Sequence, residues 1–372
     1  MNFQWNKGLI LTILFLIGLG IVQVYSSSFI FAIESRGDGL FFVRKQVVYA
    51  FIGLLVLIVT MRTPWHYFEK YGVLIWGLSI VALVLTFIPS LSIKAGGAYR
   101  WLKMPLGQRI EPAEFVKYSF PFFMAFFLTK PLKPLNNFKW PLFFLMSGSV
   151  LLLLLKQPDF GSLVICFIIL FSMAFCFELN WKYIFGGVVA IVPAFYFLIV
   201  TVPYRYARVI AFLDPWSDED NKGFQIIQSM LSYYSGGVWG VGLGQGQGKL
   251  FFLPEAHTDF TLSVLAEELG FVGLFFVLML FGFIIFKGFQ IILHTQNRYA
   301  KAVAIGVVTC FSLSVIINPG VTLGLFPTKG LSLPFLSYGG SSLVSTCFGL
   351  GILLNIDRMS RNYEMKKNFL GL

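Results

Sequence analysis

The stretch "FTLSVLAEELGFVGLFFVLMLFGFIIF", Phe260 to Phe286, decides the fold class of this chain. Its only charged residues are Glu267 and Glu268, and after Leu269 it contains no polar side chain. A helix needs about 20 mostly apolar residues to cross the hydrocarbon core of a bilayer. The stretch therefore predicts a transmembrane helix that carries two carboxylates near its beginning.

The same apolar pattern recurs along the whole chain. Of the 372 residues, 57% are hydrophobic, 43 are phenylalanine and only 12% are charged, which does not describe a soluble surface. The sequence predicts an all-α polytopic membrane protein with ten transmembrane helices, in a single integral membrane domain over residues 1–372. The expected spans are residues 9–25, 43–60, 71–87, 114–129, 141–155, 163–177, 183–202, 260–286, 302–317 and 339–355.

The charge distribution orients these spans. The terminus side holds 14 of the 28 Lys and Arg residues in short loops, and only four of the 17 acidic residues. Short loops rich in Lys and Arg are typical of the cytoplasmic side. We therefore expect cytoplasmic termini, a short basic tail at about 356–372, and a large extracytoplasmic loop between helices 7 and 8, at about 203–259.

The composition also excludes several classes of protein. The net charge of +11 is explained by the cytoplasmic loops as membrane-surface anchors, and no nucleic-acid-binding module accompanies it. All four cysteines fall inside expected spans, which supports neither a disulfide framework nor a zinc knuckle.

Two motifs of the large loop resemble ion or nucleotide sites but fail on spacing. The fifth and twelfth positions counted from Asp218 are Lys222 and Ser229, so the acidic cluster is not an EF-hand calcium loop. In "GVGLGQGQGKL", residues 240–250, Lys249 is followed by Leu250 rather than Ser or Thr, so it is not a phosphate-binding P-loop. Its glycines allow close approach of the backbone to a lipid or ligand.

Helical phase separates the carboxylates around residue 260. On a helix that begins near Asp259, a stripe of small residues formed by Ser263, Ala266, Gly270 and Gly273 lies on the side of Asp259, whereas Glu268 faces the opposite side. An ionised side chain within the membrane is a functional candidate unless it is paired. We interpret Glu267 and Glu268 as structural ion pairs with a neighbouring span and Asp259 as a general base at the helix N-terminus.

The segment "PFLSYGGSSLV", residues 334–344, stays open between two interpretations. Its glycine pair and hydroxyls suit close helix packing through small residues, and they equally suit a polar pocket lined by amides and hydroxyls.

Five motifs together resemble one family in order along nearly the whole chain. They are "GGAYRWLKMPLGQRIEPAEFVK" (96–117), "KQPDFGS" (156–162), "FLDPW" with "GFQIIQS" (212–229), "GVGLGQGQGKLFFLPEAHTDFTLSVLAEELG" (240–270) and "LFPTKGLSLPFLSYGGSS" (325–342). The chain resembles the SEDS family of shape, elongation, division and sporulation proteins. "LPEAHTDF" and "PTKG" are closer to its division members than to its elongation members.

The resemblance implies a peptidoglycan glycosyltransferase that polymerises lipid II into glycan strands on the outer face of the bacterial cytoplasmic membrane, at the division septum. It implies as partners lipid II, the growing glycan strand, a cognate class B penicillin-binding protein and other divisome proteins. Two alternatives stay open: a lipid II flippase and a non-catalytic division scaffold. Polar residues crowd the outer ends of the spans, which favours the enzyme over a flippase.

The resemblance also implies roles for individual residues. Asp259 matches the essential aspartate of the family's large loop. The expected substrate-binding residues are Arg100, Lys117, Gln157, Asp159, Lys329, Ser337 and Ser341. The expected structural residues are Glu114, His257, Glu267 and Glu268. Glu111 and Ala113 depart from the family's usual Gln-Pro-Ser-Glu, which puts any role of these two positions in doubt.

The chemistry of such a reaction assigns tasks to these groups. A carboxylate must take the proton of the acceptor hydroxyl, and positive charge must stabilise the departing pyrophosphate. We expect Asp259 to be the base and Arg100 and Lys329 to contact the pyrophosphate. We expect a divalent cation, Mg²⁺ or Mn²⁺, to help, although the spacing names no ligands for it.

Overall fold

The computed structural model describes residues 6–95, 98–104, 108–130, 139–177, 185–187, 189, 196, 203–218, 223–327 and 330–370. The chain is a polytopic α-helical membrane protein. Its helices are α1 (Lys7–Arg36), α2 (Phe41–Arg62), α3 (Trp65–Leu85), α4 (Pro112–Thr129), α5 (Lys139–Lys156), α6 (Phe160–Cys176), α8 (Pro203–Leu213), α9 (Phe224–Gly236), α10 (Thr261–His294), α11 (Arg298–Thr322) and α12 (Gly340–Leu370). Two short turns are the 3₁₀-helix η3 (Pro215–Asp218) and the π-helix η4 (Gly248–Phe252).

Most of the expected spans coincide with these helices. Seven helices in the described part of the chain are long and apolar enough to cross a membrane: α1, α2, α3, α5, α10, α11 and α12. The apolar α6 is shorter, and α4 carries a Glu and a Lys near its start. The expected span at 183–202 lies mostly outside the described residues, so the number ten stays a prediction.

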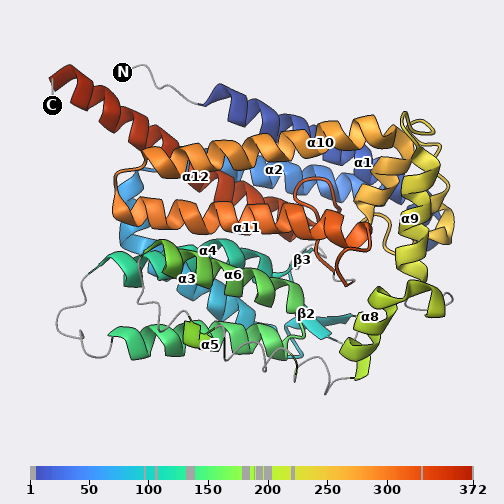
Figure 1. Ribbon diagram of the computed structural model, residues 1–372, viewed down its shortest axis with the longest axis horizontal. Coiled ribbons are helices and arrows are strands. Elements are labelled where there is room, and N and C mark those ends of the chain that lie inside the picture. The colour runs from blue at the N-terminus through green and yellow to red at the C-terminus, as the bar shows by residue number, and fades with distance from the viewer. Residues whose placement is uncertain are drawn as a thin grey trace.

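The two ends of the helix bundle differ in character. Both termini lie at one end, and α8, α9 and a small sheet lie at the other, which we call the outer end (Figure 1). The sheet is antiparallel, with strand order β1 (Ser92–Ala95), β2 (Ala98–Lys103) and β3 (Arg109–Ile110). The expected large loop therefore holds ordered helices at the end opposite the termini.

Local sequence explains where several helices begin. Asn6 and Asn297 accept the backbone N–H of Leu9 and Ala300 at 3.2 and 2.9 Å, which caps α1 and α11. Pro112 starts α4, where its missing N–H would have no helical partner. These three residues set where α1, α4 and α11 begin.

Helix α4 lies at the centre of the protein and packs against α3, α6, α11 and α12. Phe120, Phe122 and Phe123 are fully buried on different sides of it, and Trp76 of α3 stacks on Phe123 with ring centroids 4.3 Å apart. A helix that is apolar all round is a core helix. This central helix carries functional candidates at its outer end.

Helix α10, which contains residues 261–286 of the apolar stretch, is broken at Gly270, and the break corrects the predicted helical phase of its small-residue stripe. Its residue Gly270 has φ 66° and ψ −171°, and the helix begins at Thr261 rather than at Asp259. The stripe expected through Gly270 and Gly273 therefore does not continue past the break. Glycine is required at 270 because this backbone conformation disfavours any side chain.

The loop after α9 pairs the backbone groups that the break releases. The four hydrogen bonds are Val241 N to Glu267 O and Gly242 N to Glu268 O, both 3.0 Å, Phe271 N to Gly237 O, 2.9 Å, and Val272 N to Val238 O, 3.2 Å. A helix in a membrane tolerates a break only when the freed groups find partners. A Cβ at Gly240 would lie 2.2 Å from the Glu268 carbonyl oxygen, so the motif's glycine serves this contact.

The region of the expected C-terminal tail is helical. The last helix, α12, extends past the predicted end of the span near 355 and continues to Leu370, and the basic cytoplasmic tail at about 356–372 stays a prediction. The side-chain amide of Asn355 fastens α12 to the end of α2 by donating to the carbonyl oxygens of Thr60 and Thr63 at 2.7 and 2.5 Å. The basic residues after 357 are therefore part of α12.

Candidate functional site

Asp259 lies in the turn of residues 253–260 that precedes α10, which we call the Asp259 turn. The amide of Asn318, in α11, donates to the carbonyl oxygens of Asp259 and Leu331 at 2.9 and 2.7 Å. A Cβ at Gly330 would lie 3.1 Å from Oδ2 of Asp259, so this carboxylate rests against bare backbone. Asp259 is half-buried and is positioned by two segments distant in sequence.

His257 is a packing residue of the same turn. Its ring lies 5.0 and 4.9 Å from the rings of Phe31 and Phe42, centroid to centroid, and its carbonyl accepts the N–H of Tyr338 at 2.9 Å. Burial lowers the pKa of His257 below its ordinary value, so the ring is neutral at pH 7. This surrounding agrees with a structural role.

A second group of candidates lies where α5 turns into α6. The Arg100 guanidinium donates to the carbonyl oxygens of Gln157 and Pro158 at 3.4 and 2.5 Å. The amide of Gln157 donates to the Thr86 hydroxyl at 2.5 Å, and the carboxylate of Asp159 caps α6 through the N–H of Ser162 at 3.2 Å. Arg100 and Asp159 hold the backbone of this turn, and three of the expected substrate-binding residues, Arg100, Gln157 and Asp159, thus lie at it.

The start of α4 adds charge beside this group. Lys117 and Glu114 are both buried and form an ion pair at 2.7 Å. Glu111 precedes the helix, and burial together with the charges of Glu114 and Asp159 raises its pKa to about 8. Glu111 is therefore mostly a neutral acid at pH 7, and in that form it resembles the glutamine that the family resemblance implies at this position.

The segment at 330–341 links the two groups. Gly330 contacts Asp259, as described above, and the side chain of Leu331 packs on Gly161, two residues after Asp159. Further along, the Ser341 hydroxyl accepts the N–H of Glu111 at 2.8 Å. The Asp259 turn and the group formed by Arg100, Gln157, Asp159 and Glu111 therefore share one side of the outer end. Lys329 lies outside the described residues.

The segment itself is held by its own hydroxyl and by small residues. Ser337 accepts the N–H of Leu333 at 2.9 Å, which closes a turn. A Cβ at Gly340 would lie 2.4 Å from the ring of Tyr49, so this glycine permits close packing on α2. Gly340 thus serves close packing, and Ser337 serves turn formation.

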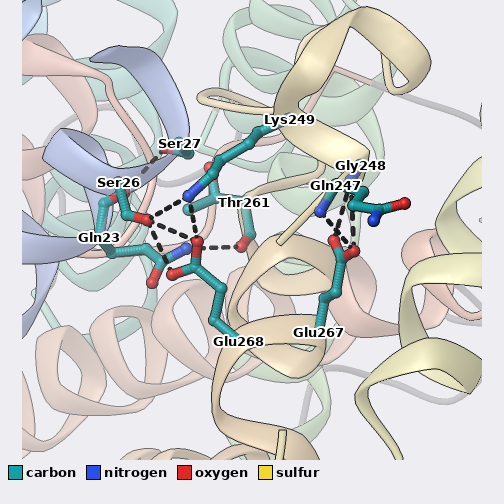
Figure 2. A network of polar contacts seen from close by, with 9 residues as sticks. All are labelled: Gln23, Ser26, Ser27, Gln247, Gly248, Lys249, Thr261, Glu267 and Glu268. Carbon is teal, nitrogen blue, oxygen red and sulfur yellow. Dashed lines mark hydrogen bonds and ion pairs between the residues drawn. The ribbon is translucent and has the colours of Figure 1, made fainter. Parts of the chain in front are cut away.

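Glu268, in the first turns of α10, belongs to a buried polar network with Lys249 and Ser26 (Figure 2). Its Oε1 lies 2.6 Å from Nζ of Lys249, and Ser26 of α1 donates to the same carboxylate at 2.6 Å. Lys249 also donates to Ser26 at 3.0 Å. The predicted ion pair thus exists for Glu268, but its cation comes from the outer loop rather than from a neighbouring span.

Glu267 has no ion pair among the contacts of the described residues, which corrects its prediction. Its carboxylate accepts the backbone N–H groups of Gln247 and Gly248, at 2.7 Å and at 3.1 to 3.3 Å (Figure 2). The glycine-rich loop therefore does cradle an anion, and that anion is the protein's own carboxylate. We call Ser26, Lys249, Glu267, Glu268 and these two amides the clasp.

Several of these residues escaped the sequence analysis. Asn318, Thr86, Ser26 and Lys249 contact candidates far away in the sequence, and only Lys249 carried a signal, as a lone charge beside an apolar run. The described residues hold no group of three or more His, Cys, Asp or Glu side chains that could bind a metal ion.

Comparisons with known proteins give one consistent answer. The profile of the FtsW/RodA/SpoVE family, described as "Cell cycle protein", matches residues 7–362. A "Probable peptidoglycan glycosyltransferase FtsW" of Geobacter metallireducens is 41% identical over 339 residues, which are 91% of this chain and 90% of the relative. "Stage V sporulation protein E" of Bacillus subtilis is 34% identical and covers 95% of this chain and 97% of the relative.

Two solved structures share the fold. One is described as "Structural coordination of polymerization and crosslinking by a peptidoglycan synthase complex", with a TM-score of 0.76, 26% identity, and coverage of 96% of this chain and 98% of the other. The other is the rod shape determining protein RodA of Thermus thermophilus, with a TM-score of 0.68, 25% identity, and coverage of 95% and 97%.

Proposed function

The chain belongs to the FtsW/RodA/SpoVE family, and from this premise we propose that it is a peptidoglycan glycosyltransferase that polymerises lipid II with Asp259 as its general base. The relatives named as peptidoglycan glycosyltransferases FtsW support the activity. The single observation that supports the site is the half-buried carboxylate of Asp259, which rests on the bare backbone of Gly330.

The geometry suits a carboxylate that must meet a substrate hydroxyl. A general base needs to come within about 3 Å of the proton that it takes. Asn318 fixes the backbone of Asp259 through its carbonyl oxygen, which positions the side chain just before α10. Gly330 leaves space beside the carboxylate, which a larger residue would occupy.

The leaving group needs positive charge at the same site. We assign Arg100 and Lys329 to the pyrophosphate, with Lys117, Gln157, Asp159, Ser337 and Ser341 as further substrate-binding residues. Arg100 is suited because a guanidinium has five N–H donors and two of them face carbonyls of the α5–α6 turn, which orients the plane. The arginine is therefore oriented for a bidentate hydrogen-bonded contact with phosphate oxygens.

A divalent cation, Mg²⁺ or Mn²⁺, stays part of the proposal in a limited form. The described residues do not fit a metal site made of protein ligands alone. Mg²⁺ is commonly held by one or two carboxylates together with substrate phosphates. We therefore infer that a cation would arrive with the pyrophosphate, and we assign it no step.

The remaining assignments concern partners and place. We propose that the chain works with a class B penicillin-binding protein and other divisome proteins, on lipid II and a growing glycan strand, in the cytoplasmic membrane at the septum. The structural likeness to a peptidoglycan synthase complex supports a partner that crosslinks. The identity to relatives named FtsW supports the division role.

The test is polymerisation of labelled lipid II by purified protein and its penicillin-binding partner, with products separated on a gel. Asp259→Asn keeps the shape of the side chain and removes the base, and we expect polymer to fall about 10²- to 10⁴-fold. The matched control is Glu255→Gln, an exposed carboxylate four residues earlier, which should leave polymer unchanged. Long strands from Asp259→Asn would contradict the assignment.

The same assay separates the alternatives. Lipid II in detergent is accessible without any flipping, so a flippase or a silent scaffold would give no polymer that depends on Asp259.

A further inference from the structure

Helix α9 and the loop that follows it carry an apolar surface at the outer end that the proposed reaction does not use. Tyr234 and Trp239 are 86% and 79% exposed. We call the exposed apolar and aromatic side chains of this segment the α9 patch: Met230, Leu231, Tyr234, Val238, Trp239 and Val241. An exposed apolar surface of this kind marks a contact with another protein or with a membrane.

The outward side of α9 is unlike that of a surface helix in water. Hydroxyl groups are buried on its inner side, where Ser229 lies 2.6 Å from the Ser263 hydroxyl and donates to the Thr322 carbonyl oxygen at 2.5 Å. Ser232 is buried as well, whereas the patch residues of the helix are exposed. A surface helix in water has charged and polar residues on its outer face. The outer face of α9 is therefore suited to apolar surroundings.

The sequence around the patch contains no charge. Residues 223–248 are 26 consecutive residues without a charged side chain. Lys249, which follows them, is buried in the clasp. An interface with a soluble protein usually has a polar rim, whereas Tyr and Trp without charges are typical of the boundary between bilayer and water. This composition favours lipid as the occupant.

Helix α10 fixes the depth of the patch. It is long and apolar enough to cross a membrane, and after its break residues 271–286 are all apolar and end at Lys287. These 16 residues are about 24 Å long, most of the hydrocarbon thickness of about 30 Å. Phe271 and Val272 are exposed at the outer end of this segment. They therefore face lipid near the outer edge of the hydrocarbon layer.

The patch continues this lipid-facing surface of α10. The N–H of Phe271 donates to the Gly237 carbonyl oxygen at 2.9 Å, and the N–H of Val272 donates to the Val238 carbonyl oxygen at 3.2 Å. Backbones joined in this way lie about 5 Å apart. Val238 and Trp239 therefore lie at the depth of Phe271 and Val272.

We propose that the α9 patch is seated in the lipid leaflet at the outer end, with α9 in the plane of the headgroups and Trp239 beside the first carbons of the acyl chains. Helix α9 lies crosswise to α10 and α11 (Figure 1), which is the orientation of an interfacial helix. Part of the expected large loop is thus a membrane anchor. The hydrogen bond of Ser229 with Ser263 joins this anchor to the start of α10, whatever reaction the protein performs.

The test isolates the fluorescence of Trp239 as the difference between the wild-type chain and Trp239→Phe, each in lipid nanodiscs without a partner protein. One quencher is a phosphatidylcholine with a nitroxide on its acyl chain near the headgroup, and the other is iodide in the buffer. We expect the nitroxide lipid to remove most of the Trp239 emission and iodide to remove little, because an interfacial side chain touches lipid. The control is the same difference for Trp76→Phe, since Trp76 is only 6% exposed and should be quenched less by both.

A second probe tests α9 itself. Tyr234→Trp adds a tryptophan to the otherwise unchanged chain, and its emission should follow the same order. Stronger quenching by the nitroxide lipid than by iodide at both positions supports the proposal. Equal or stronger quenching by iodide at either position would place the patch in water, as a surface for a soluble partner domain, and would overturn it. Trp239 emission that neither quencher reduces would mean that protein covers the patch, which also overturns it. Melting temperatures equal to that of the wild type show that the variants are folded.

Discussion

The two glutamates of the clasp and Asp259 lie within ten residues of each other on the chain, yet their carboxylates have different surroundings. The side chain of Glu268 is fully buried, with an ammonium and a hydroxyl bonded to it. Asp259 is half-buried, and the turn is held through its carbonyl oxygen. The difference leads us to expect a structural role for the fully buried, ion-paired Glu268 and the proposed catalytic role for the half-buried Asp259.

The largest expected effect on stability comes from breaking the clasp. Glu268→Ala leaves the Lys249 ammonium buried without its carboxylate, which typically costs about 3–5 kcal/mol. Thermal unfolding in detergent should show a clear drop in melting temperature, whereas Asp259→Ala should change it little.

A double variant checks the cause of that drop. Lys249→Met with Glu268→Leu removes both charges and should recover much of the lost stability, because an apolar pair needs no compensation. If Glu268→Ala melted like the wild type, the clasp would not be structural and the contrast with Asp259 would fail.

Glu111 offers an intermediate case, since it is half-buried beside like charges. Its pKa is raised to about 8 from an ordinary value of 4.5, so the folded state holds the proton more tightly than the unfolded state. The stability that this proton provides is complete below about pH 4.5 and is lost as the pH rises to about 8. The loss should be roughly 2 kcal/mol, after allowance for partial exposure.

Glu111→Gln tests this pH dependence. Glutamine does not titrate, so the melting temperature of the variant should fall less than that of the wild type between pH 5 and pH 8. Parallel curves for the two proteins would show that the like charges around Glu111 do not act on it.

The smallest expected effect belongs to Glu267. Glu267→Gln keeps one oxygen as an acceptor for the Gln247 and Gly248 amides but removes the charge and the second oxygen. The cost should be about 1 kcal/mol, the difference between a charged and a neutral hydrogen bond. A loss of unfolding free energy as large as that of Glu268→Ala would mean that Glu267 stabilises the clasp as much as Glu268 does, and would contradict this prediction.

Much of the fold was predictable because spans are a local property. Each expected span except the one at 183–202 overlaps a described helix, since length and apolar composition alone decide whether a segment can cross a bilayer. The break at Gly270 was not predictable, because it depends on the loop at 237–242 that receives its freed backbone groups.

The candidate site was predictable in its parts and not in its pairing. Motif resemblance singled out Asp259, Arg100 and Asp159, and their positions at one end of the bundle follow from the span boundaries. Asn318 was missed because an asparagine inside an apolar helix has no pattern of its own, and its role depends on the two carbonyl oxygens that it meets.

The sequence by itself determined where nine of the ten expected spans lie, the common end of the termini and the family motifs, since these depend on composition and order along the chain. Only the tertiary structure decided which charges are paired. Ser26 and Glu268 are 242 residues apart and share a hydrogen bond of 2.6 Å. No local pattern encodes such a contact, because it exists only when packing buries both groups together, here with the Lys249 ammonium bonded to both.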